Sequence, residues 1–109
     1  MPVPETTVEE LAAALAEGRR PVLLDVRSHG EHLTVALPDS VLVPLPELAE
    51  RLDELEDVRE HEIIAYCHHG IRSRSATALL LAAGFPRVSS LRGGIEAWAV
   101  RVQPGMRRY

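Results

Sequence analysis

The feature that most constrains the fold is an apolar run at residues 62–67 (EIIAYC), which ends in the only cysteine of this 109-residue chain. A strand with apolar side chains on both faces must be buried on both sides, and in parallel sheets helices pack against both faces. A short polar connection follows, and then an Ala- and Leu-rich helical pattern at residues 73–83 that ends at Gly84. Because this pattern is apolar almost all round, we expect the helix to be deeply buried against the sheet.

Helical and strand patterns alternate along the rest of the chain, which is typical of an α/β layer fold. Thr7 and Glu10 form a capping box ahead of the first helix, and Gly18 follows that helix. The predicted helices span 8–16, 46–55 and 95–100, and the predicted strands span 21–26, 40–43 and 88–91.

These elements predict one domain over residues 1–109 with a three-layer fold. We expect a central, mostly parallel sheet of about four to five strands, flanked by helices on both faces. The core should span residues 7–105, and residues 106–109 form a C-terminal tail in which Arg107-Arg108 is either a solvated end or a docking patch. Residues 103–109 are expected at the rim of the binding pocket.

The charge and hydropathy pattern exclude some classes of partner. A net charge of −4 argues against nucleic-acid binding, because phosphate backbones favour a basic surface. No apolar run approaches the ~20 residues of a transmembrane helix, so no membrane partner is expected. Residues 1–10 lack the basic and apolar segments of a secretory signal, and we therefore expect a cytoplasmic location.

Cys67 lies at the carboxyl end of the predicted central strand, where open α/β folds bind ligands. A lone cysteine can be a buried apolar thiol, a metal ligand or a reactive thiolate. The connection CHHGIRSRS at residues 67–75 is short enough for its backbone N–H groups to curl around the sulfur. Gly70 permits the positive φ that such a curl requires.

The two arginines of this connection indicate an anion. Arg72 and Arg74 oppose the dipole of the helix that they begin, at a cost of about 0.3–1 kcal/mol each if exposed. A thiolate at Cys67 or an incoming oxyanion would remove that conflict. His68 and His69 directly follow the cysteine, so the three side chains cannot readily converge on a tetrahedral zinc ion, and no metal is expected. The histidines are instead candidates for general acids, a polar pocket rim or solvated loop residues.

Three motifs, in this order along the chain, resemble the rhodanese-like sulfurtransferase family. Asp25-Val26-Arg27 with Glu31 is similar to the family's D-V-R…E segment. The loop CHHGIRS at 67–73 is similar to its active-site loop, and LRGGIEAW at 91–98 is similar to its L-x-G-G-x-x-x-W signature. Together with the order of helices and strands, the resemblance covers residues 7–105.

The resemblance implies a sulfurtransferase in which Cys67 takes a sulfane sulfur from a donor such as thiosulfate and holds it as a persulfide. The acceptor would be cyanide, a thiol or a protein, and no separate cofactor is needed. The residues implied to bind sulfur or substrate are His68, His69, Gly70, Ile71, Arg72 and Ser73, with Arg72 orienting an anionic donor. Supporting roles are expected for Asp25, Arg27, Glu31 and Arg74.

The sequence departs from the family pattern beside the expected site. Without gaps from Asp25, the family's G-H-I-P-G-A stretch falls on residues 35–40 (VALPDS), which lack both glycines and the histidine. His32 also stands where an aromatic residue is usual. These changes bear on which donor fits more than on the chemistry of the cysteine.

Other functions remain open at this stage. One is a binding module without turnover, and another is a protein-to-protein sulfur relay that supplies a biosynthetic enzyme. Phosphatases and arsenate reductases on the same fold resemble this loop but have five residues between cysteine and arginine. Here five intervening residues lead from Cys67 to Ser73, whereas four lead to Arg72, so the shorter loop favours a sulfur atom.

Overall fold

The computed structural model describes residues 2–109 and contains a five-stranded sheet in the order β1-β5-β4-β2-β3. All the strand pairs are parallel. The strands are β1 (Glu5–Thr6), β2 (Val22–Asp25), β3 (Val41–Leu42), β4 (Ile63–Tyr66) and β5 (Val88–Leu91). The helices are α1 (Val8–Ala16), α2 (His29–Thr34), α3 (Leu45–Leu48), the 3₁₀ helix η1 (Leu52–Val58), α4 (Arg72–Ala82) and α5 (Gly94–Arg101).

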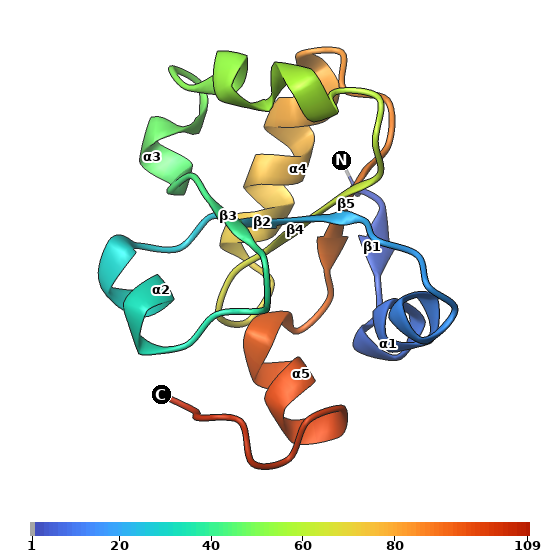
Figure 1. The fold of residues 1–109 in the computed structure, drawn as a ribbon. Coiled ribbons are helices and arrows are strands. Elements are labelled where there is room, and N and C mark those ends of the chain that lie inside the picture. The colour runs from blue at the N-terminus through green and yellow to red at the C-terminus, as the bar shows by residue number, and fades with distance from the viewer. Residues whose placement is uncertain (1) are drawn as a thin grey trace.

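The three predicted layers are confirmed (Figure 1). β4 occupies the middle of the sheet, and its four residues are buried. Ile63, Ala65 and Cys67 pack with the apolar side chains of α3 and α4 on one face. Ile64 and Tyr66 point the other way and pack with those of α1 and α5. The two faces follow from the two-residue period of a strand, which sends neighbouring side chains to opposite sides.

Local signals predicted some elements well. The Thr7–Glu10 capping box is present at the start of α1, with both reciprocal hydrogen bonds formed. Two elements were missed. β1 is only two residues long and α2 has no buried residue, so neither carries an apolar periodicity.

Two predictions about helices are wrong. The helix expected over 46–55 is interrupted after Leu48, and η1 begins at Leu52. A 3₁₀ helix repeats every three residues, so Leu52 and Leu55 still face the core together. The helix α4 is buried along one face only, through Ser73, Ala76, Thr77 and Leu80, because no element covers its outer side.

The parallel strands place the candidate site. β2 and β4 run in register with Asp25 opposite Tyr66, so the residues that follow both strands emerge at the same edge of the sheet. The carboxyl ends of parallel strands are where α/β folds bind ligands. Cys67 follows β4 directly, and Arg27 lies two residues beyond β2. No helix among residues 2–109 is long and apolar enough to cross a membrane.

Candidate active site

The loop between β4 and α4 wraps around the sulfur of Cys67. The backbone N–H of Gly70 donates to Sγ at 3.1 Å, and the N–H of Ser73 donates at 3.4 Å. The Sγ–H group is in turn 3.4 Å from Ser73 Oγ, which lies 2.7 Å from Ser90 Oγ. Cys67 is only 1% exposed. Two amides and one hydroxyl therefore surround the sulfur atom, and both amides point positive hydrogen atoms at it.

Helix α5 supports this loop from behind. The N–H groups of Ile95 and Glu96, in its first turn, donate to the carbonyls of Cys67 at 2.9 Å and His68 at 3.1 Å. This approach requires Gly94, whose φ is +63° and whose Cβ, if it had one, would lie 2.5 Å from the Cys67 carbonyl oxygen. Gly94 thus lets the N-terminus of α5 approach the Cys67 loop closely.

Arg72 lies beside the loop but is held by Glu31. Its Nη1 and Nη2 contact the two carboxylate oxygens of Glu31 at 2.7 and 2.9 Å. The Arg72 guanidinium lowers the pKa of Glu31 far below its ordinary value, and the pKa of Arg72 rises in return. The structure brings these two predicted residues together in a bidentate ion pair, and the role of Arg72 toward a donor stays a prediction.

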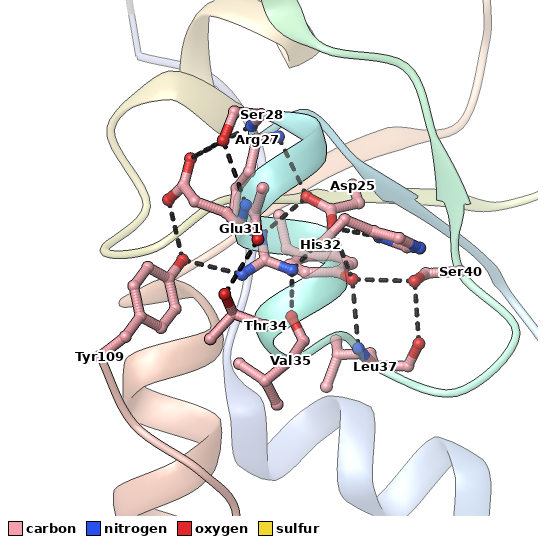
Figure 2. A network of polar contacts seen from close by, with 12 residues as sticks. Asp25, Arg27, Ser28, Glu31, His32, Thr34, Val35, Leu37, Ser40 and Tyr109 are labelled. Atoms are coloured by element: carbon pink, nitrogen blue, oxygen red, sulfur yellow. Dashed lines mark hydrogen bonds and ion pairs between the residues drawn. The ribbon is translucent and has the colours of Figure 1, made fainter.

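A second, deeper ion pair joins Asp25 to Arg27, and both side chains are completely buried (Figure 2). Arg27 Nε and Nη2 donate to the two Asp25 oxygens at 2.8 and 2.7 Å, and Nη2 also reaches the Val35 carbonyl. Burial alone would raise the pKa of Asp25, but hydrogen bonds from Arg27 and His32 outweigh it, and the pKa is lowered. The pair fixes the segment after β2 from which Glu31 reaches Arg72.

Tyr66 extends this network into the stretch that departs from the family pattern. Its hydroxyl donates to Ser40 Oγ at 2.9 Å, lies 3.2 Å from Asp25 Oδ2, and accepts from the Leu37 N–H. Burial raises the pKa of Tyr66 to about 12. Asp39, where the family has glycine, adopts φ of 59°, so the left-handed turn survives without glycine.

The rings of the two loop histidines and of Tyr109 in the C-terminal tail form a stack. The rings of His68 and His69 stack at 4.0 Å, and Tyr109 stacks on the other side of His68 at 3.9 Å. Among residues 2–109, His68 Nε2 is the one buried side-chain polar atom without a hydrogen-bond partner. Burial lowers the pKa of His68, which is consistent with a neutral ring.

The C-terminal tail reaches this site through Tyr109. Its hydroxyl accepts from Arg27 Nη1 at 2.8 Å and donates to Glu31 Oε2 at 2.9 Å (Figure 2). Arg108 also pairs with Glu96, and Met106 packs against the core between α1 and α5. These contacts arise because the chain turns back after α5 toward the loop.

Two predicted residues lie outside this network. Ile71 is 77% exposed at the N-terminus of α4. Arg74 is exposed on the first turn of α4, so its supporting role stays a prediction. A pocket of about 350 Å³ with a mostly apolar surface lies beside Arg72, and its other lining residues are Val26, Arg27, Ser28, His29, Pro44, Leu45, Pro46 and Glu47. No cluster of three or more potential metal ligands occurs in residues 2–109.

Fold and site together define a class: a parallel α/β domain that presents one cysteine in a loop of backbone amides at the carboxyl edge of its sheet. The rhodanese-like domain family matches residues 7–101. This protein belongs to that family.

Similar proteins carry sulfurtransferase names. A sulfurtransferase of Allochromatium vinosum is 35% identical, with 89% of each chain covered. The structure of a thiosulfate sulfurtransferase from Pseudomonas aeruginosa superposes with a TM-score of 0.82 at 34% identity, covering 97% of this chain and 21% of that one. The adenylyltransferase and sulfurtransferase MOCS3 of Arabidopsis thaliana is 32% identical over 93% of this chain, which matches 25% of the relative.

Sequence reasoning gave no specific contact to four residues of the polar network: His32, Ser40, Tyr66 and Tyr109. A signal existed for the segment around His32, because Ser28 and Glu31 follow the capping-box pattern that begins α2. Tyr66 was read only as part of an apolar strand. Nothing local in the sequence indicates that Tyr109 returns to His68.

Proposed function

We propose that this protein is a persulfide-forming sulfurtransferase with Cys67 as its nucleophile. The observation that carries the proposal is the pair of backbone N–H groups, from Gly70 and Ser73, that point at Sγ. Hydrogen bonds from amides favour a sulfur that carries negative charge, and a thiolate is the reactive form of cysteine. The same two amides would also stabilise the Cys67 thiolate when it leaves in the second half of the cycle.

The transfer cycle has two displacements. The Cys67 thiolate attacks the outer sulfur of thiosulfate, a new S–S bond forms, and the donor's S–S bond breaks so that sulfite leaves with the electron pair. Cyanide or a thiolate then attacks the outer sulfur of the persulfide, and the Cys67 thiolate leaves. Charge balances in each step, and no oxidant or metal is consumed. This is covalent catalysis by an activated nucleophile.

The burial of Cys67 supports the same chemistry. A sulfur that is 1% exposed is largely shielded from water, and water or oxidants would otherwise consume a persulfide. The Ser73 hydroxyl, 3.4 Å from Sγ, accepts the thiol proton in the resting state. Thiolate formation requires loss of that proton to solvent, after which the Ser73 hydroxyl, 2.7 Å from Ser90 Oγ, can turn to donate to the sulfur.

A relay between proteins is the second candidate. The similarity to the sulfurtransferase part of MOCS3, which covers a quarter of that relative, favours protein donors or acceptors. Ile71, exposed beside the site, would contact such a partner. Rapid loading by a protein persulfide together with slow loading by thiosulfate would favour the relay.

Steady-state kinetics tests the proposal. Sulfur transfer from thiosulfate to cyanide is measured while both concentrations are varied, with Ser75→Ala, an exposed change on α4, as the matched control. A persulfide intermediate predicts parallel double-reciprocal lines for the wild type and the control, and no turnover for Cys67→Ser. Intersecting lines, or full turnover by Cys67→Ser, would contradict the covalent mechanism.

A further inference from the structure

Arg72, the residue expected to attract an anionic donor, is engaged by Glu31 across the end of its guanidinium, and its side chain is 39% exposed. Both of its terminal nitrogens are held by Glu31, at 2.7 and 2.9 Å. A bidentate guanidinium–carboxylate pair uses the same two N–H directions that an oxyanion would use. An anionic donor that approaches the Nη1–Nη2 end of Arg72 must therefore compete with Glu31.

Glu31 is also held by Ser28, whose N–H and Oγ–H donate to Oε1 at 3.1 and 3.2 Å, and by Tyr109 at the other oxygen. The Tyr109 hydroxyl donates to Glu31 Oε2 at 2.9 Å and accepts from Arg27 Nη1 at 2.8 Å. Arg27 is itself immobilised, because it is completely buried and is bonded to Asp25 and to the Val35 carbonyl. The hydroxyl thus ties the surface carboxylate of Glu31 to a fixed buried cation (Figure 2).

The ring of Tyr109 adds a second constraint. It lies 3.9 Å from the His68 ring, with only 10° between the two planes. His68 follows Cys67 in the loop, so the tyrosine contacts both the loop and the ion pair beside it. Its hydroxyl and its ring can be removed separately, which makes its role testable.

We propose that Tyr109 is a specificity-determining residue that positions Glu31 against Arg72 and so disfavours dianionic sulfur donors relative to donors of low charge. The inference rests on the proposed function and narrows its donor class to organic persulfides. The pocket beside Arg72 has a mostly apolar surface, although Ser28, His29 and Glu47 also line it, and its apolar part suits an organic donor better than an inorganic one.

The test compares thiosulfate with cysteine persulfide as donors for wild type and Tyr109→Phe. The phenylalanine can keep the stack on His68 and removes only the hydroxyl. We expect the half-saturating concentration of thiosulfate to fall by about two- to fivefold, the range for one partly exposed charged pair. The maximal rate and the half-saturating concentration of cysteine persulfide should not change.

A double-mutant cycle separates this role from a general structural one. Glu31→Gln should also lower the half-saturating thiosulfate concentration, and Tyr109→Phe should then change nothing further in that background. The exposed Arg107→Ala is the control and should behave as wild type.

An unchanged or raised half-saturating thiosulfate concentration in Tyr109→Phe would overturn the inference. If that variant fails to fold, an unchanged value in Glu31→Gln overturns it equally. A wild type that accepts sulfur from neither donor refutes the proposed function, and this inference with it. A wild type that accepts sulfur normally while the variants show no shift refutes the role of Tyr109 alone.

Discussion

Asp25→Asn should destabilise the protein far more than its small change in shape suggests. The carboxylate accepts hydrogen bonds from Arg27 N, Nε and Nη2 at 3.0, 2.8 and 2.7 Å, and both side chains are fully buried. An asparagine would replace one oxygen by an NH₂ group that faces the guanidinium donors. The Arg27 charge would then remain buried without a counter-charge.

Breaking a buried ion pair by removing one partner costs about 3–5 kcal/mol, out of a total stability of about 5–15 kcal/mol for a small domain. At about 4 °C per kcal/mol for a chain of this length, the melting temperature should fall by about 12–20 °C. Urea unfolding followed by circular dichroism measures the loss, with the exposed Asp53→Asn as control. A loss below about 1 kcal/mol in Asp25→Asn would refute the reasoning.

The pH dependence gives this prediction a second readout. The folded state lowers the pKa of Asp25, so its ionised form contributes stability that is fully present above the unfolded value of about 3.9. That contribution is lost as the pH falls through the folded pKa. The stability difference between wild type and Asp25→Asn should therefore narrow below about pH 4. A difference that stays constant with pH would mean that the charge of Asp25 is not the cause.

Three further substitutions test the geometry around the loop. Gly94→Ala should lower the free energy of unfolding by at least about 2 kcal/mol and also lower transfer activity, because the new Cβ would collide with the Cys67 carbonyl oxygen at a positive φ. Near-native stability in urea would contradict this prediction. Asp39→Gly should leave the free energy of unfolding unchanged or raise it by up to about 1 kcal/mol, because the φ of 59° at this position favours glycine. A clear loss of stability in the same assay would show that the aspartate side chain stabilises the turn. Tyr66→Phe should lower the free energy of unfolding by about 1–3 kcal/mol, because the buried Leu37 N–H loses its acceptor. An unchanged melting temperature would argue against that hydrogen bond.

The sequence was most informative where the signal was local or strongly apolar. The run over residues 62–67 predicted β4 and its central place, because only a covered strand tolerates apolar side chains on both faces. Thr7 and Glu10 predicted the start of α1, since the capping box is completed within four residues. The order of elements then placed Cys67 at the ligand-binding edge.

Contacts between distant segments could not be predicted in the same way. Tyr109 reaches Glu31 across 78 positions of sequence, and no periodicity or turn signal records such a return. Arg72 was expected to face an anion because it opposes the helix dipole. In the structure the anion is Glu31, a residue of the chain itself, which resolves the conflict without a ligand.

The most direct test of the central claim locates the transferred sulfur. The wild-type protein is incubated with thiosulfate or cysteine persulfide, freed of excess donor, and digested for tandem mass spectrometry without reduction. We predict a gain of one sulfur atom on the peptide that contains Cys67, its complete loss after cyanide treatment, and no gain in Cys67→Ser. An unmodified Cys67 with both donors, or a sulfur that persists after cyanide, would contradict the account.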